Sequence, residues 1–188
     1  MTDKGKKVLA ILGLTLLVNV GIEAKASSVK VNEIKAVTVK NSEEAAAVKV
    51  AEEFINGYIG VPNDNFGNWY YSQPVSKKFK SEYDNIVEAF DLEENILSGE
   101  KKESELTKEE KDLLKKYDYV EYDPIFGAGI MDVTESSFKV TSYNTKTGNM
   151  VLKDVSKKVE IDFPVKVLKE DGKWVVDGAG GVNIPVKK

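Results

Sequence analysis

The chain has 188 residues, a formal net charge of −4, and neither cysteine nor histidine. All of its 27 basic residues are lysine, since the sequence contains no arginine. These absences exclude thiolate nucleophiles, disulfides, imidazole bases and soft-metal sites, and leave Asp, Glu, Lys, Tyr, Ser and Thr for any chemistry. The acidic balance disfavours nucleic acid and anionic lipid as partners. We expect no metal and no other cofactor.

Residues 1–26 have the three-part layout of a secretory signal. Three lysines precede an apolar run over residues 8–22, and Ala24 and Ala26 stand at the small positions that signal peptidase requires. The run is shorter than the ~20 residues of a spanning helix, and Asn19 interrupts it. We therefore expect cleavage after Ala26 and export to the periplasm or the medium; the alternative is an N-terminal membrane anchor.

Residues 27–41 are polar with scattered valines, and predict either a tether or an added edge strand. Residues 42–188 predict a single domain, whose first helix is capped by Asn41 or Ser42. Apolar residues then recur at helical spacing as far as Tyr58. The residues that predict the end of this helix are Gly57, Gly60 and Pro62.

The stretch "GVPNDNFGNWYYSQP" predicts a loop that carries three adjacent aromatic residues, Trp69, Tyr70 and Tyr71. Three consecutive side chains cannot all face the core, so we expect at least one to be exposed. Exposed aromatic residues are enriched at binding sites, which makes these three candidate ligand contacts. The alternative is that they are ordinary core and rim residues. The "NDNFGN" segment lacks the acidic spacing of a calcium loop, so no metal site is predicted there.

Two further helices are predicted before the chain changes its pattern. Ser72 and Pro74 are start signals for the second, whose buried stripe ends at Phe90. Thr107 and Glu110 form the capping box of a third, short helix.

The apolar period changes from helical to two after residue 135. "SSFKVTSYN" and "MVLKDV" predict two strands, and Asp171-Gly172 predicts a hairpin within "KKVEIDFPVKVLKEDGKWVV". Pro164 predicts an edge position or a bulge in this third strand. Helices followed by a meander predict an α+β fold, with three N-terminal helices packed on a curved antiparallel sheet.

Four short motifs carry a family resemblance: Phe54 with Tyr58 in the first helix, "VSKKF" at residues 75–79, "DPIF" at residues 123–126, and "EDGKWVV". Together they resemble an uncharacterised family of exported bacterial domains in the nuclear transport factor two-like superfamily. The resemblance covers about residues 42–180. It implies a cone whose open end can hold a small molecule; some members are isomerases or dehydratases, many only bind, and some dimerise through the sheet. The chain departs from the family at Ile125, where a Phe is usual, and in "GAG", where a polar residue is usual.

The stretch "YDPIFGAGIMD" holds the two acids of greatest interest, Asp123 and Asp132. Asp before Pro and two nearby glycines are typical of a turn, and this interpretation needs no chemistry. The alternative is a carboxylate pair inside the cone, with one acid tuned to act as a base. Asp132 lies at or near the start of a strand and is less needed to form a turn, so it is the better candidate for facing the cone.

The sequence therefore predicts an exported, non-catalytic module that binds a small apolar or aromatic ligand or a protein partner, with a homodimer through the sheet as a further expectation. The alternative is an isomerase or hydro-lyase that uses Asp132 or Asp123 with a tyrosine. The candidate ligand contacts are Trp69, Tyr70, Tyr71, Phe126 and Asp132.

Overall fold

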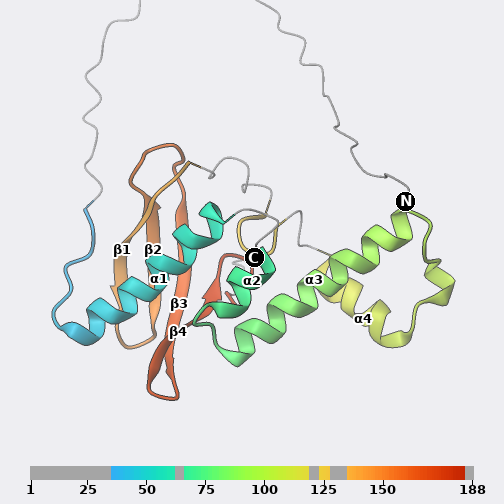
Figure 1. Ribbon diagram of the computed structural model, residues 1–188, viewed down its shortest axis with the longest axis horizontal. Helices are drawn as coiled ribbons and strands as arrows, with labels where there is room; N and C mark the ends of the chain where they lie inside the picture. Colours follow the sequence, from blue (N-terminus) through green and yellow to red (C-terminus); the bar gives the residue numbers. More distant parts are fainter. Residues whose placement is uncertain (1–34, 62–65, 119–122, 128–134, 185–188) are drawn as a thin grey trace, which may run out of the picture. The chain divides into compact units, whose positions relative to one another are not determined.

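The computed structural model describes residues 35–61, 66–118, 123–127 and 135–184. Within these ranges the helices come first and an open antiparallel sheet follows, which confirms the predicted α+β class (Figure 1). The arrangement is consistent with a cone-like α+β fold. The expected signal and Asp132 lie outside the described residues. In the part of the chain that is described, no helix has the length and apolar character to cross a membrane.

Helix α1, Ser42–Gly60, begins where the Asn41 side chain accepts a hydrogen bond from the Glu44 N–H. The helix ends at Gly60, within the predicted stop formed by Gly57, Gly60 and Pro62, and it continues through Gly57. A Cβ atom at Gly57 would lie 2.7 Å from the Trp69 ring, so this glycine makes room for the ring. The buried face of α1 consists of Ala47, Ala51, Phe54, Ile55 and Tyr58.

The predicted loop before the second helix contains a short helix, α2, Phe66–Ser72. Helix α3, Lys77–Leu97, follows it and is capped by Ser76. After a 3₁₀ turn, Glu103–Glu105, comes α4, Lys108–Tyr117, with the predicted capping box of Thr107 and Glu110 confirmed. The described chain thus has one helix more than the three that were predicted.

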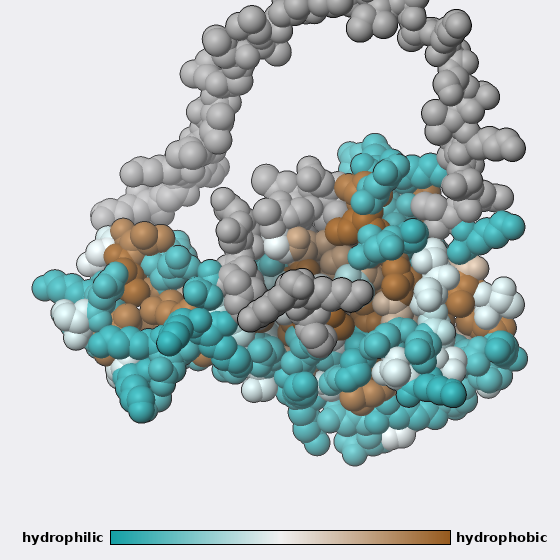
Figure 2. Space-filling view, turned by 180° about the vertical axis from the view of Figure 1, so that it is seen from behind, coloured by the Kyte–Doolittle hydropathy of each residue, from teal (hydrophilic) through white to brown (hydrophobic). Residues whose placement is uncertain are grey.

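Helix α4 packs against the C-terminal part of α3 (Figure 1). Hydrophobic side chains gather between the two helices, where they line a hollow of about 310 Å³ (Figure 2). Leu97 at its margin is 81% exposed.

Four strands form one sheet in the order β1-β2-β3-β4, with every neighbouring pair antiparallel. The predicted hairpin is confirmed: Asp171 and Gly172 both have positive φ, as a tight two-residue turn requires. β3 begins later than predicted, so residues 157–161 precede the strand. The strands are β1 Phe138–Asn144, β2 Asn149–Asp154, β3 Asp162–Glu170 and β4 Lys173–Ala179.

The expected edge position of Pro164 is wrong, because β3 lies between β2 and β4. The Pro164 carbonyl accepts from the Gly180 N–H at 3.1 Å. A residue's N–H and C=O point to the same side in an antiparallel ladder, so the donor that proline lacks falls where β4 ends. The bulge of β3 comes two residues later, between Lys166 and Val167.

Helix α1 lies across one face of the sheet, in contact with β1, β3 and β4 (Figure 1). The start of α3 is fixed to β4 by a buried polar cluster. The Ser76 hydroxyl donates to Asp177 at 2.8 Å and also accepts from the Phe79 N–H, and Lys166 donates to Asp177 at 2.7 Å. This cluster holds in place the helix that forms one wall of the site described next.

Candidate functional site

Helices α2 and α3 enclose a groove of about 440 Å³, named here the tyrosine groove. Three tyrosine rings and one valine supply its apolar surface, and three carboxylates of α3 supply its charge. The lining residues are Gly67, Tyr70, Tyr71, Tyr83, Asp84, Val87, Glu88 and Asp91.

The three rings differ in exposure. Tyr70 is 2% exposed and stacks on Tyr83, with 4.4 Å between ring centroids. Tyr71 is 63% exposed, which confirms that the adjacent aromatic residues do not all face inward. The ammonium of Lys80 lies over the Tyr71 ring, 4.5 Å from its centroid. The groove thus has a buried aromatic floor and an exposed aromatic rim.

The buried tyrosines of the groove stay protonated at neutral pH. Burial raises the pKa of Tyr70 above its usual range, and the charge of Asp84 adds to the effect. Burial also raises the pKa of Tyr83, to about 12. Neither hydroxyl is therefore suited to act as a base.

Two of the predicted ligand contacts lie outside the groove, one packed against the hydrophobic core and one within it. Trp69 is half-buried and packs on Phe54 and Tyr58, at 5.7 and 6.0 Å between ring centroids. Phe126 is buried and stacks on Phe163 at 4.5 Å. Of the predicted contacts, the groove contains Tyr70 and Tyr71.

The sequence interpretation missed the α3 wall of the groove, although a signal was present. Asp84, Val87, Glu88 and Asp91 recur at spacings of three and four, which places them on one face of a helix. That face lies beside the buried stripe, and only the position of α2 against α3 makes it a groove wall.

Asp123 forms a turn, as its sequence context predicted. One carboxylate oxygen accepts from the N–H groups of Ile125 and Phe126, at 2.9 and 2.6 Å. Its carbonyl accepts from the N–H of Gly127, which has a φ of 58°. The second carboxylate oxygen accepts from the Tyr58 hydroxyl at 2.8 Å. Asp123 therefore joins α1 to the turn.

The Tyr58–Asp123 pair extends to the tyrosine groove. Tyr58 and Tyr83 also interact through their hydroxyls. A carboxylate cannot donate, so Tyr58 donates its proton to Asp123. Burial, and after it the charge of Asp123, raise the pKa of Tyr58 far above its usual range. The chain of three groups is suited to holding a proton in place rather than releasing it.

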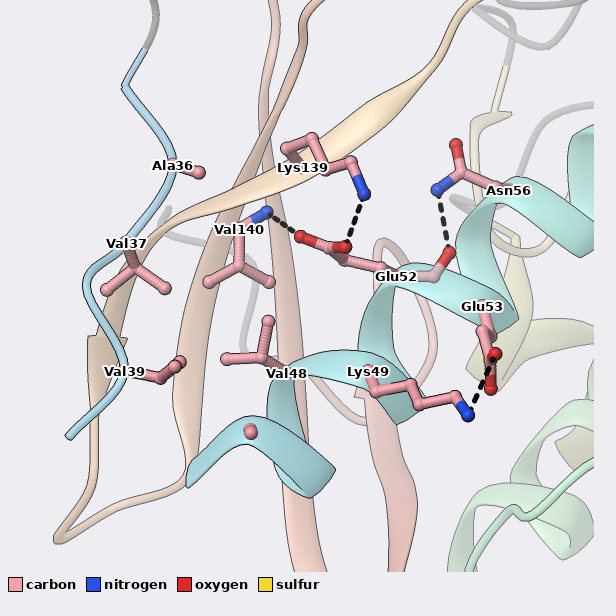
Figure 3. Close-up of a pocket in the computed structure, with 11 residues that line it drawn as sticks. Ala36, Val37, Val39, Val48, Lys49, Glu52, Glu53, Asn56, Lys139 and Val140 are labelled. Atoms are coloured by element: carbon pink, nitrogen blue, oxygen red, sulfur yellow. Dashed lines mark hydrogen bonds and ion pairs between the residues drawn. The ribbon is translucent and has the colours of Figure 1, made fainter. Parts of the chain in front are cut away.

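A second groove, of about 580 Å³, lies between residues 35–40, α1 and β1 (Figure 3). Residues 35–40 have no regular secondary structure, and the Val37 N–H donates to the Val140 carbonyl at 2.8 Å. Glu52 accepts from the Val140 N–H at 2.9 Å and from the Lys139 ammonium at 2.8 Å. Of the polar groups that line this groove, Glu52 is used in closing the edge of β1, while Lys49 and Glu53 pair with each other at 3.6 Å.

Comparison of the chain with protein-family profiles, curated proteins and solved structures gave no match. Within the described residues, no group of three or more acids is placed to hold a metal ion. The fold and the site define an α+β domain, with helices before an open meander, that carries an aromatic and acidic groove between two of its helices.

Proposed function

We propose that the chain is an exported binding module of the nuclear transport factor two-like superfamily, and that its tyrosine groove holds a small ligand with an apolar or aromatic body. The layout of residues 1–26 supports export, and the order of helices and strands supports the superfamily. One observation carries the binding role: Tyr71 stands 63% exposed beside the buried, stacked pair of Tyr70 and Tyr83. The groove also falls within the 300–1,000 Å³ or so that is usual for small-molecule sites.

The protonation of the groove favours binding over catalysis. A general base works best when its pKa lies near the working pH, and the pKa values of Tyr70 and Tyr83 are raised far from it. Neutral phenol rings, by contrast, present apolar area to a ligand. The groove is thus better suited to hold a molecule than to transform it.

Titration with N-phenyl-1-naphthylamine, an uncharged fluorescent probe with aromatic rings, tests the proposal. We expect saturable binding with a Kd of about 10–100 μM, typical of a small apolar body in an open groove. Tyr71→Ala should weaken binding about 5- to 10-fold, because an aromatic contact and its buried area are lost. Tyr71→Phe keeps the ring and should bind nearly as the unaltered chain does.

Leu97→Ala provides the matched control, because it removes an exposed apolar side chain from the hollow between α3 and α4. This variant should leave the probe affinity unchanged. If Leu97→Ala abolishes binding while Tyr71→Ala does not, the probe occupies the other hollow and the proposal is wrong.

The second candidate function is that of an isomerase or hydro-lyase with an Asp/Tyr pair. The 2.8 Å contact between Tyr58 and Asp123 is the observation that favours it. Against it, both oxygens of Asp123 already accept hydrogen bonds within the chain, and the raised pKa of Tyr58 disfavours proton release.

A further inference from the structure

We infer that the tyrosine groove prefers ligands whose apolar body carries a positive charge, such as a substituted ammonium. This inference rests on the proposed function and specifies the chemical class of the ligand. Two features carry it: a wall of carboxylates without partners, and an aromatic rim that already holds a cation.

The carboxylates of the groove are Asp84, Glu88 and Asp91, which lie on one face of α3. In the described part of the chain, none of the three forms a salt bridge or a hydrogen bond. Glu82 on the same helix does, with Lys116 at 3.1 Å. Within the described residues, the carboxylates of the groove wall are therefore not engaged in salt bridges, and a ligand ammonium could pair with them.

The Tyr71 ring at the rim already has a cation over its face. The Lys80 ammonium lies 4.5 Å from the ring centroid, within the ~6 Å over which a cation is attracted to an aromatic face. An alkylammonium group is thus sterically and electrostatically compatible with this ring. Aromatic faces and carboxylates are the two kinds of group that recognise organic ammonium ions, and both line the groove. Lys80 itself would repel a second cation.

The negative charge of the wall acts on the interior of the groove. After burial, the charge of Asp84 is the next cause that raises the pKa of Tyr70, and it also raises that of Tyr83. An electric field that opposes a phenolate at these hydroxyls also favours a cation in the adjoining groove.

Two isosteric compounds separate charge from shape: phenyltrimethylammonium and tert-butylbenzene. Each competes with N-phenyl-1-naphthylamine for the full-length folded chain at low salt. We expect the cation to displace the probe at a concentration about five-fold or more lower than the neutral compound. This advantage should shrink at about 0.5 M salt, because exposed carboxylates are then screened.

Variants that remove charges test whether the carboxylates of the groove cause the preference for the cation. Glu88→Gln with Asp91→Asn should reduce the cation's advantage to about two-fold or less, with tert-butylbenzene unaffected. Glu93→Gln with Glu94→Gln makes the same change in net charge on α3 outside the groove, and should keep the advantage. Lys80→Met should strengthen binding of the cation about two- to three-fold and leave the neutral compound unchanged.

Equal displacement by the two compounds, or equal losses in the groove variant and its control, would overturn the preference for cations and leave the proposed function standing. Failure of the proposed function looks different: N-phenyl-1-naphthylamine then fails to bind, or binds without regard to Tyr71. Saturation-transfer NMR with phenyltrimethylammonium alone completes the test: if no saturation passes from the chain to this compound, the preference for cations is rejected.

Discussion

The side-chain amide of Asn56 in α1 hydrogen-bonds both backbone groups of Phe138 in β1. Its oxygen accepts from the Phe138 N–H at 2.7 Å, and its nitrogen donates to the Phe138 carbonyl at 2.9 Å. β1 is an edge strand, so the amide takes the place of a neighbouring strand at this point. Glu52, one turn earlier, does the same for the Val140 N–H (Figure 3). Helix α1 therefore covers the sheet and also closes an edge that could otherwise pair with another chain.

Asn56→Ala should lower the free energy of unfolding by about 2–4 kcal/mol, because two backbone groups lose their partners. Urea denaturation measures the loss, and light scattering should show faster aggregation of the variant, since the edge of β1 becomes open to pairing. The matched control is Asn95→Ala. Asn95 is a helical asparagine that makes no side-chain hydrogen bond within the described residues, and its loss should cost about 0.5 kcal/mol or less. If the two variants prove equally stable, water replaces the amide and the edge-closing role of Asn56 is wrong.

The lowered pKa of Asp154 leads us to expect that the free energy of unfolding depends on pH. The residue is 1% exposed, and its carboxylate accepts from the N–H groups of Ser137, Ser156, Lys158 and Val159 and from the Ser156 hydroxyl. Burial acts to raise the pKa of Asp154, but the hydrogen bonds outweigh burial and hold the pKa well below its usual range. The folded pKa thus lies below the unfolded value of about 3.9, so this stabilisation is present above pH ~4 and is lost as pH falls further.

Asp154→Asn should therefore be less stable than the unaltered chain at pH 7, by about 2–3 kcal/mol, because an amide cannot accept all of these bonds. The difference should shrink as the pH is lowered from about 5 to 2, since the protonated carboxyl then resembles the amide. Chemical denaturation at each pH gives the comparison. Asp112→Asn, at an exposed position of α4, should show a small effect without this trend. A difference that stays constant with pH would mean that ionised Asp154 contributes no stability.

The longer helices and the sheet could be predicted because their signals are local. Apolar spacing, caps and the Asp171-Gly172 turn each act within a few residues of the chain. The short helix α2 could not be predicted in this way. Its seven residues show too little periodicity and form too few internal hydrogen bonds to nucleate a helix alone. Contacts of Trp69 with Phe54 and Gly57 hold it in place. The same contacts explain why Gly57 is a spacer and not a helix terminator.

The candidate site could be predicted only in part for a similar reason. An exposed aromatic residue could be predicted here, because three adjacent side chains cannot all be buried, and Tyr71 is that residue. The acids at 84, 88 and 91 appear in the sequence as an ordinary solvated helix face. They become a groove wall only through the packing of α2 on α3, and this packing depends on residues far apart in the chain.

The contact between Tyr58 and Asp123 gives the last prediction, which separates a structural role from a catalytic one. Asp123→Ala leaves the N–H groups of Ile125 and Phe126 and the Tyr58 hydroxyl without their acceptor, and should cost about 2–4 kcal/mol in the free energy of unfolding. Asp123→Asn should cost about 1 kcal/mol or less, because its amide oxygen can still accept from the turn.

Both variants should bind N-phenyl-1-naphthylamine in the tyrosine groove as tightly as the unaltered chain, because Asp123 does not line it. Native mass spectrometry of the purified protein would identify any co-purifying ligand, and its turnover can then be followed with each variant. A catalytic Asp123 would show the opposite pattern, since Asp123→Asn would keep its stability and lose all turnover. Tyr58→Phe sharpens the distinction. If Tyr58 only anchors the turn, this variant loses about 1 kcal/mol of stability and no activity; if Tyr58 is a general acid, turnover falls by about 10²-fold or more.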